Sequence, residues 1–205
     1  MIGFVTGLTA EATLARRLSP LVCAGGGTPQ GAAKAALSLL DQGARALVSF
    51  GLAGGLDPAL LPGALVVPAR VMTNDDEFIC DPELSAQFGG FTIDLHYAGE
   101  KIVITAAQKA ALFVSTGAAA IDLESGAVAK VAAQAGVAFA VLRAVCDPAG
   151  RDLPNAAMIA LDPQGAISGV RVLMSVLRSP GQIFGLTKLA WDARAARARL
   201  VALRA

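Results

Sequence analysis

Short apolar segments alternate with helix-like segments along most of this 205-residue chain. The apolar segments are rich in Val, Ile, Leu, Phe and Ala, and they lie at residues 1–6, 46–50, 64–67, 101–105 and 137–144. Helical patterns separate them at residues 9–18, 30–41, 107–115 and 124–134. Strands that alternate with helices are typical of α/β domains, so the sequence predicts that fold class.

The remaining segments extend this pattern without a break that marks a domain boundary. Residues 74–90 are acidic and predict a loop with one short helix, and residues 118–122 predict a short extended segment. Beyond Pro154 the pattern is helical, at 165–178 and again from Ser179-Pro180-Gly181 to the end. We expect a single domain over residues 1–205, which is an ordinary domain length.

Composition excludes several classes of protein. Hydrophobic residues make up 55% of the chain, which is enough for a large core, and the net charge of +1 offers no electrostatic basis for binding nucleic acid. Charges interrupt every apolar run before the roughly 18 residues that a membrane span needs. The first residues read as a strand and not as a signal peptide, so we expect a cytoplasmic protein. Three widely spaced cysteines and one histidine, His96, predict neither a disulfide framework nor a metal site, and no cofactor is expected.

Polar residues follow the apolar segments at four places, namely Thr6–Glu11, Gly51–Gly55, Asp122–Glu124 and Asp147. Ligands of open α/β sheets bind beyond the carboxyl ends of the strands, so these places are the candidate site. A carboxyl group buried against apolar walls has a raised pKa, which suits it to acid–base chemistry.

Two glycine-rich segments have two readings each. Gly25, Gly26, Gly27 and Thr28 precede a helix and can supply donors to a phosphate or a water molecule, although they fit no nucleotide-binding fingerprint. They can equally form a tight turn. The segment Gly51–Gly55 either lets the backbone approach a ligand or only lets the strand turn.

Together these segments resemble the nucleoside phosphorylase/nucleosidase superfamily, which includes purine nucleoside phosphorylases and methylthioadenosine/S-adenosylhomocysteine nucleosidase. The matching motifs are Thr6-Gly7-Leu8-Thr9-Ala10-Glu11, Gly51-Leu52-Ala53-Gly54-Gly55-Leu56, Ile121-Asp122-Leu123-Glu124-Ser125 and Arg143-Ala144-Val145-Cys146-Asp147. The resemblance implies a three-layer αβα sandwich with a central mixed β-sheet. It also implies a homo-oligomer, a dimer or larger, and a purine nucleoside as the small-molecule partner.

The resemblance also implies roles for individual residues. Asp147 matches the acid that protonates N7 of the purine, Glu124 the carboxylate that binds the ribose hydroxyls, and Glu11 the residue that activates water. Arg143 matches an arginine near the nucleophile, and Leu123 replaces the usual Met beside the ribose. The other expected substrate-binding residues adjoin these in the motifs: Asp122, Cys146, Gly51, Leu52, Ala53 and Gly54.

Purely structural readings of the same residues stay open. Asp147-Pro148 can be a turn, Glu124 and Glu11 can be early-helix acids that favour the helix dipole, and Arg143 can pair with a carboxylate.

The chain departs from the superfamily pattern where the nucleophile binds. The Gly-Ser-Ala-Gly form common in nucleosidases is here Gly51-Leu52-Ala53-Gly54, and Ser49 stands where hexameric phosphorylases carry a phosphate-binding Arg. Water therefore fits slightly better than phosphate as the nucleophile, although phosphate remains open as a co-substrate. The aromatic residue that usually stacks on the base is not evident, and Phe78 and Phe113 are the alternatives.

Within the superfamily the short chain looks most like the hopanoid-associated phosphorylase branch, which is linked to removal of adenine from adenosylhopane. Arg194, Arg197 and Arg199 in the C-terminal helix allow peripheral membrane contact, or only a solvated helix face. Residues 148–163 are a candidate lid. Three hypotheses follow: cleavage of an adenine nucleoside with a bulky apolar 5′ substituent, a methylthioadenosine-type hydrolase, or a non-catalytic nucleoside-binding protein.

Overall fold

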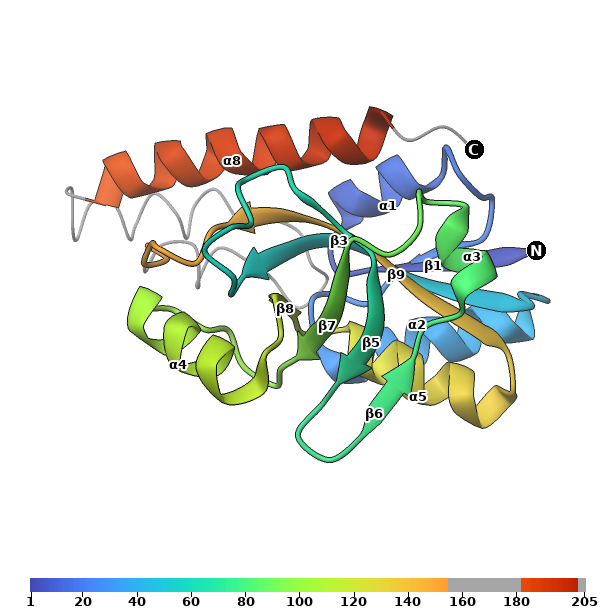
Figure 1. The fold of residues 1–205 in the computed structure, drawn as a ribbon. Coiled ribbons are helices and arrows are strands. Elements are labelled where there is room, and N and C mark those ends of the chain that lie inside the picture. The colour runs from blue at the N-terminus through green and yellow to red at the C-terminus, as the bar shows by residue number, and fades with distance from the viewer. Residues whose placement is uncertain (155–181, 203–205) are drawn as a thin grey trace.

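The two longest strands, β3 (Ala46–Gly55) and β9 (Ala138–Asp147), pair in parallel at the centre of a mixed sheet. The structure is a computed structural model that describes residues 1–154 and 182–202. Its nine described strands run β2-β1-β3-β8-β7-β5-β6, with β9 beside β3 and β4 beside β9 (Figure 1). The other strands are β1 (Ile2–Thr6), β2 (Val22–Ala24), β4 (Leu65–Val66), β5 (Pro68–Met72), β6 (Glu77–Ile79), β7 (Ile93–Ala98) and β8 (Ala120–Asp122).

Helices cover both faces of this sheet (Figure 1). One face packs on α1 (Thr9–Ala15), α3 (Pro82–Ala86) and α8 (Gln182–Ala202), through a cluster that includes Phe4, Phe50 and Leu200. The other face packs on α2 (Pro29–Asp41) and α5 (Ser125–Ala135), through a cluster that includes Leu39, Leu47 and Val128. The predicted α/β fold, with helices on both sides of a central mixed sheet, is therefore confirmed.

The remaining helix described in residues 1–154, α4 (Ala106–Thr116), packs Leu112 and Phe113 in a cluster with Ile121 of β8 and has well-formed ends. The Thr105 hydroxyl accepts a hydrogen bond from the backbone N–H of Gln108 at 3.2 Å, and the Gln108 side chain accepts one from the Thr105 N–H at 3.1 Å. This capping box satisfies donors that the helix start leaves without partners. Gly117 ends the helix in the left-handed conformation, with φ of 71°.

Several segments differ from the sequence prediction, among them the strands β2 and β5, which lie outside every predicted strand. Residues 101–105 form no strand, because Ile104 and Thr105 donate their backbone N–H groups to the Gln108 side chain at the start of α4. The strand lies earlier, at Ile93–Ala98, where Asp94 and His96 break the apolar pattern that would have revealed it. The acidic segment 74–90 contains the strand β6 as well as the predicted short helix, α3. The helix predicted at 165–178 lies outside the described residues, whereas the helix expected after Gly181 is α8.

The strand directions bring the candidate segments to one edge of the sheet. Strands β1, β3 and β9 are parallel, so Thr6, Gly54 and Asp147 lie at their carboxyl ends. A register shift between Ala53 and Gly54 lets the end of β3 also pair in antiparallel fashion with β8, which places Asp122 alongside. Among the described residues, no helix combines the length and the apolar character that crossing a membrane requires.

Candidate functional site

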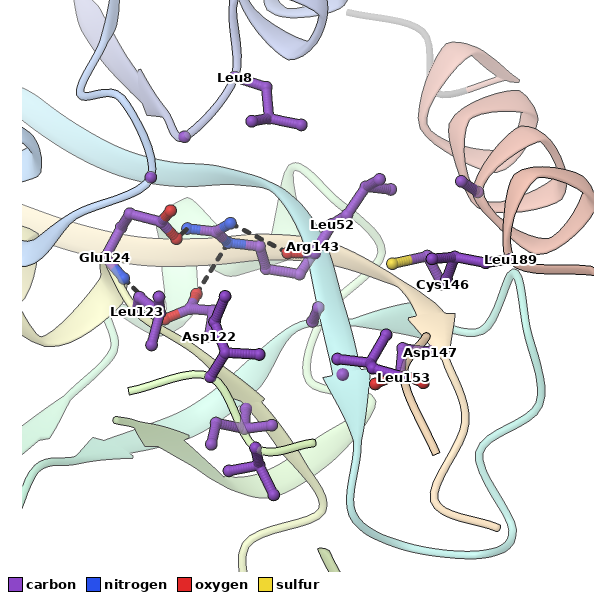
Figure 2. A pocket seen from close by; sticks show the side chains of 18 of the residues that line it. Leu8, Leu52, Asp122, Leu123, Glu124, Arg143, Cys146, Asp147, Leu153 and Leu189 are labelled. Atoms are coloured by element: carbon purple, nitrogen blue, oxygen red, sulfur yellow. Dashed lines mark hydrogen bonds and ion pairs between the residues drawn. The ribbon is translucent and has the colours of Figure 1, made fainter. Parts of the chain in front are cut away.

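A cavity of about 610 Å³ opens at this edge of the sheet (Figure 2). Four acidic side chains from four segments of the chain line it: Glu11, Asp122, Glu124 and Asp147. All four are buried, with no more than 7% of each residue exposed to solvent. Carboxylates are rarely buried without partners, so the groups that surround each acid determine what it can do.

Arg143 organises two of these acids from the middle of β9. Its Nη2 donates to Oε2 of Glu124 at 2.9 Å and to Oγ of Ser49 at 2.7 Å, and its Nη1 donates to the Leu52 carbonyl at 3.1 Å. Its Nε lies 2.9 Å from Oδ2 of Asp122. Burial favours the neutral guanidine, but the carboxylates of Asp122, Glu124 and Glu11 outweigh it and raise the pKa of Arg143. The side chain is a fixed cation that orients its acidic neighbours, as Figure 2 shows.

Asp122 has a structural role in the site. Its Oδ1 accepts hydrogen bonds from the backbone N–H groups of Glu124 and Ser125 at 3.1 and 3.0 Å, which fixes the start of α5. Its Oδ2 contacts the Ser125 hydroxyl and lies 3.2 Å from Nε2 of the buried His96. Burial opposes the charged form, but Arg143, His96 and Ser125 outweigh burial and hold the pKa of Asp122 well below its ordinary value. Asp122 is therefore a permanent carboxylate whose oxygens are already occupied.

Glu124 is held with one oxygen available. Arg143 occupies Oε2, and Oε1 faces Gly7, where an added Cβ would lie 2.5 Å from this oxygen. Only glycine at position 7 leaves room for the carboxylate. Burial raises the pKa of Glu124 to about 7, aided by the charges of Asp122 and Glu11 and opposed by Arg143. Near neutral pH this group therefore exists in both charge states.

Glu11 links α1 to β3 through both of its oxygens. Oε2 accepts a hydrogen bond from the Leu8 N–H at 2.8 Å, and Oε1 accepts one from the Leu52 N–H at 2.9 Å. A Cβ at Gly51 would lie 2.7 Å from the Glu11 carboxyl carbon, so glycine is required there too. Burial raises the pKa of Glu11, although Arg143 and the two backbone donors oppose the shift.

Asp147 has a partner that the sequence analysis missed. Lys109 of α4 is fully buried, and its Nζ lies 2.6 Å from Oδ2 of Asp147. Burial raises the pKa of Asp147, while the hydrogen bond and the charge of Lys109 act against that shift. Lys109 is the only charged residue of α4. A single lysine in an otherwise uncharged, Ala-rich helix was the one sequence feature that could have indicated a site residue. However, a lone lysine usually marks the solvent-exposed face of a helix.

Some of the other expected site residues line the cavity, and others pack away from it. Leu52, Ala53, Gly54, Leu123 and Cys146 line the cavity. Of the expected phosphate or water segment, only Gly27 reaches it. Gly25 packs against α2, where a Cβ would lie 2.6 Å from the Ala32 nitrogen, and Thr28 caps α2 by accepting a hydrogen bond from the Gly31 N–H. The described positions of Gly25, Gly26 and Thr28 therefore support the tight-turn reading.

One wall of the cavity is largely apolar and comes from α8. It is lined by Leu186, Leu189, Ala190 and Ala193, together with Arg197, and Leu189 lies beside Cys146 and Asp147 (Figure 2). The lining also includes Lys101, Ile102, Val103 and Leu153. No aromatic side chain is among the described residues of the lining, and Phe78 and Phe113 instead pack in hydrophobic clusters. Most of the candidate lid, residues 155–163, lies outside the described residues.

Comparisons with known proteins agree with the fold described above. The sequence model of the Phosphorylase superfamily matches residues 13–173. An S-adenosylhomocysteine nucleosidase from Streptococcus pyogenes, in complex with 5-methylthiotubericidin, aligns with a TM-score of 0.66 and 17% identity, over 93% of this chain and 95% of that chain. Futalosine hydrolase of Helicobacter pylori gives a TM-score of 0.67 and 18% identity, over 97% and 94%.

A third similar structure is the 5′-methylthioadenosine/S-adenosylhomocysteine nucleosidase from S. pneumoniae, bound to a transition-state inhibitor. Its TM-score is 0.70 at 16% identity, over 98% of this chain and 97% of that chain. Identities this low establish the shared fold and nothing finer. No curated protein matches the chain.

Proposed function

The chain belongs to the Phosphorylase superfamily, and from that premise we propose that it cleaves the N-glycosidic bond of a purine nucleoside, with adenine as the base. One observation carries the proposal: Asp147 and Glu124, which come from different strand ends, share one cavity. Each has an environment suited to a separate part of the reaction. Pairs of titratable groups in contrasting environments are how active sites divide acid chemistry from charge stabilisation.

Asp147 is the proposed general acid. Cleavage breaks the bond between C1′ of the ribose and N9 of the base, and both bonding electrons leave with the base. A proton on N7 makes that base a neutral leaving group. Burial raises the pKa of Asp147, which favours the protonated carboxyl group that this role requires.

Glu124 is the proposed ribose ligand. As the base leaves, positive charge develops on the ribose, and a carboxylate beside the sugar stabilises it. Arg143 holds Oε2 of Glu124, which leaves Oε1 to accept hydrogen bonds from the 2′- and 3′-hydroxyls. The contact with Arg143 also favours the ionised form that this role requires.

Water is the proposed nucleophile, activated by Glu11. The water oxygen bonds to C1′, and its proton passes to the Glu11 carboxylate, whose pKa burial has raised. The Ser49 hydroxyl is not available to bind a phosphate, because it is buried and hydrogen-bonded to Arg143 and Ser125. Gly27 and Arg197 also line the cavity, so comparing turnover with and without phosphate tests this choice directly.

The substrate class follows from the wall of α8. An apolar surface of four small or aliphatic side chains of α8 in the cavity wall suits a nucleoside with an apolar 5′ substituent. Adenosylhopane is a substrate of this kind. One of the similar structures, a nucleosidase mutant of H. pylori, holds 5′-methylthioadenosine in its active site. Assembly into a homo-oligomer and membrane contact by α8 remain predictions.

The test of the acid is Asp147→Asn, which keeps the shape and removes the transferable proton. We expect adenine release to fall by about 10²–10⁴-fold, the usual contribution of general acid catalysis. Asp75→Asn is the matched control, because Asp75 is exposed and far from the cavity lining. If wild type releases free base from no adenine nucleoside, with or without phosphate, the protein is a nucleoside-binding protein and the enzymatic proposal fails.

The test of the substrate class is Leu186→Ser, with Ala198→Ser on the exposed side of α8 as its control. Burying a leucine side chain is worth about 1.5–3 kcal/mol, so KM for a nucleoside with a long apolar 5′ chain should rise by roughly tenfold or more. KM for adenosine should change little, since adenosine lacks the chain. An equal rise for both substrates would contradict placing the 5′ group against α8.

A further inference from the structure

The ammonium group of Lys109 is unusual because it is fully buried and has three acceptors. Besides Oδ2 of Asp147 at 2.6 Å, Nζ contacts the carbonyl oxygens of Pro148 at 3.1 Å and Arg151 at 2.8 Å. A lysine ammonium has three donors, so each one is used. All three acceptors lie in the five residues Asp147–Arg151, at and just beyond the end of β9. Lys109 therefore acts on one short segment that carries the proposed acid.

We propose that Lys109 is a positioning residue for the reaction: it orients the Asp147 carboxyl group and stabilises the carboxylate that forms when N7 takes the proton. This inference rests on the proposed function, because it assigns Lys109 a part in the same proton transfer. It goes beyond the acid itself to the group that determines how strong that acid is. Lys109 acts through Asp147 and has no assigned contact with the substrate.

Orientation follows from which oxygen Lys109 occupies. Nζ contacts Oδ2, and among residues 1–154 and 182–202 no donor to Oδ1 is present. Oδ1 is therefore the oxygen that can hold the transferable proton toward the base. The Pro148 and Arg151 carbonyls fix the position of Nζ, so the carboxyl group is held by a rigid partner. Groups held in place before reaction lose less free energy in reaching the transition state.

The electrostatic argument concerns the change of charge on Asp147. During transfer its O–H bond breaks, the N7–H bond forms, and a neutral carboxyl becomes a carboxylate. A buried carboxylate is costly, but an ammonium at 2.6 Å stabilises the charge as it appears. Lys109 therefore makes a buried acid strong enough to donate. Without it, burial alone would leave an acid that holds its proton too tightly.

Other charges near Asp147 are farther out or compensated. Arg151, in the following loop, favours the carboxylate, and Asp192 of α8 disfavours it. These two residues form an ion pair with each other, so their effects on Asp147 partly cancel. The Cys146 thiol beside Asp147 is neutral, because burial raises its pKa to about 12. Lys109 is left as the dominant charge that acts on the acid.

The experiment compares pH–rate profiles of adenine release for wild type, Lys109→Met and Lys109→Arg. Activity requires protonated Asp147 and is lost as pH rises through the pKa of Asp147. Removing the ammonium raises that pKa, so the alkaline limb of Lys109→Met should move up by about 1–3 pH units, the usual effect of losing an opposite charge. Its maximal kcat should fall at least tenfold. Lys109→Arg keeps the charge, so its alkaline limb should stay near that of wild type.

Lys130→Met is the control for loss of a lysine charge, since Lys130 is exposed on α5 and lies 3.6 Å from Asp76. If Lys109→Met does not fold, Lys109→Gln replaces it, because an amide keeps hydrogen-bond donors but carries no charge. An unshifted alkaline limb in a folded, uncharged variant overturns the inference. So does failure of both uncharged variants to fold, which would assign Lys109 to the fold alone. If wild type itself releases no base, the proposed function is what has failed.

Discussion

Replacing Arg143 by Met should destabilise the protein by an amount that depends on pH. Methionine keeps an unbranched apolar stem but removes the cation that contacts Asp122, Glu124 and Ser49. The two carboxylates then remain buried beside each other without their partner. Breaking a buried ion pair in this way costs about 3–5 kcal/mol, a large share of the 5–15 kcal/mol by which folded proteins are stable.

The pH dependence follows from the pKa of Glu124. In wild type it is about 7, above the ordinary value of about 4.3 for an unfolded chain, so the folded state binds the proton more tightly. Tighter proton binding by Glu124 adds to the free energy of unfolding at low pH, and this contribution is lost as pH rises through the pKa of the folded state. Losing Arg143 raises the folded pKa further. The gap between wild type and Arg143→Met should therefore widen from pH 6 to pH 8.5.

The assay is urea unfolding at both pH values, supported by thermal melting. For a chain of this size each kcal/mol lowers Tm by about 2–4 °C, so we expect a loss of about 6–20 °C. Adding Glu124→Gln to Arg143→Met removes one of the buried carboxylates that have lost their partner, and it should restore part of the stability at pH 8.5. Arg45→Met, at an exposed arginine, is the control. A loss below 1 kcal/mol for Arg143→Met at pH 8.5 would refute the claim that Arg143 compensates these acids.

Three further predictions concern the pH dependence of the reaction, the close packing of Gly25 against α2, and the N-terminal cap of α4. The rate of base release by wild type should fall as pH drops below about 7, because Glu124 becomes protonated, and a pH–rate profile with its maximum near pH 5 would contradict this assignment. Gly25→Ala should destabilise by about 1–3 kcal/mol in urea, because its Cβ meets the α2 backbone, whereas Gly150→Ala has open space and should change little. Thr105→Ala should cost about 0.5–2 kcal/mol through the lost cap of α4; an unchanged urea midpoint would show that the cap is dispensable.

The acids at the strand ends could be found from sequence because each follows an apolar strand directly. Asp147 ends β9, which runs parallel to β1 and β3, so the rule for open α/β sheets places it at the edge where those strands end. Glu124 follows β8, which is antiparallel to β3 and reaches this edge by pairing with the last residues of β3, a pairing that the rule does not predict. The α/β class follows from the alternation of elements, whereas the central mixed sheet with helices on both faces was implied by the resemblance to the superfamily.

Contacts across distant segments could not be found in this way. Lys109 looks like an exposed lysine in its own helix, and only packing of α4 against the end of β9 buries it beside Asp147. Thr28 and Gln108 have ordinary side chains whose roles as helix caps depend on where the backbone bends. The strand β7 escaped prediction because His96 and Asp94 interrupt it, and the contact between the buried His96 and Asp122 joins residues far apart in the sequence.

The wall formed by α8 has a consequence for how such an enzyme can diversify. The four acids, Arg143 and Lys109 all lie within the first 147 residues, whereas much of the apolar lining lies beyond residue 182. In the proposed function, bond cleavage and recognition of the 5′ substituent are thus encoded in separate stretches of the gene. Exchanging the C-terminal helix can redirect the protein to a new nucleoside while every proton-handling group stays in place.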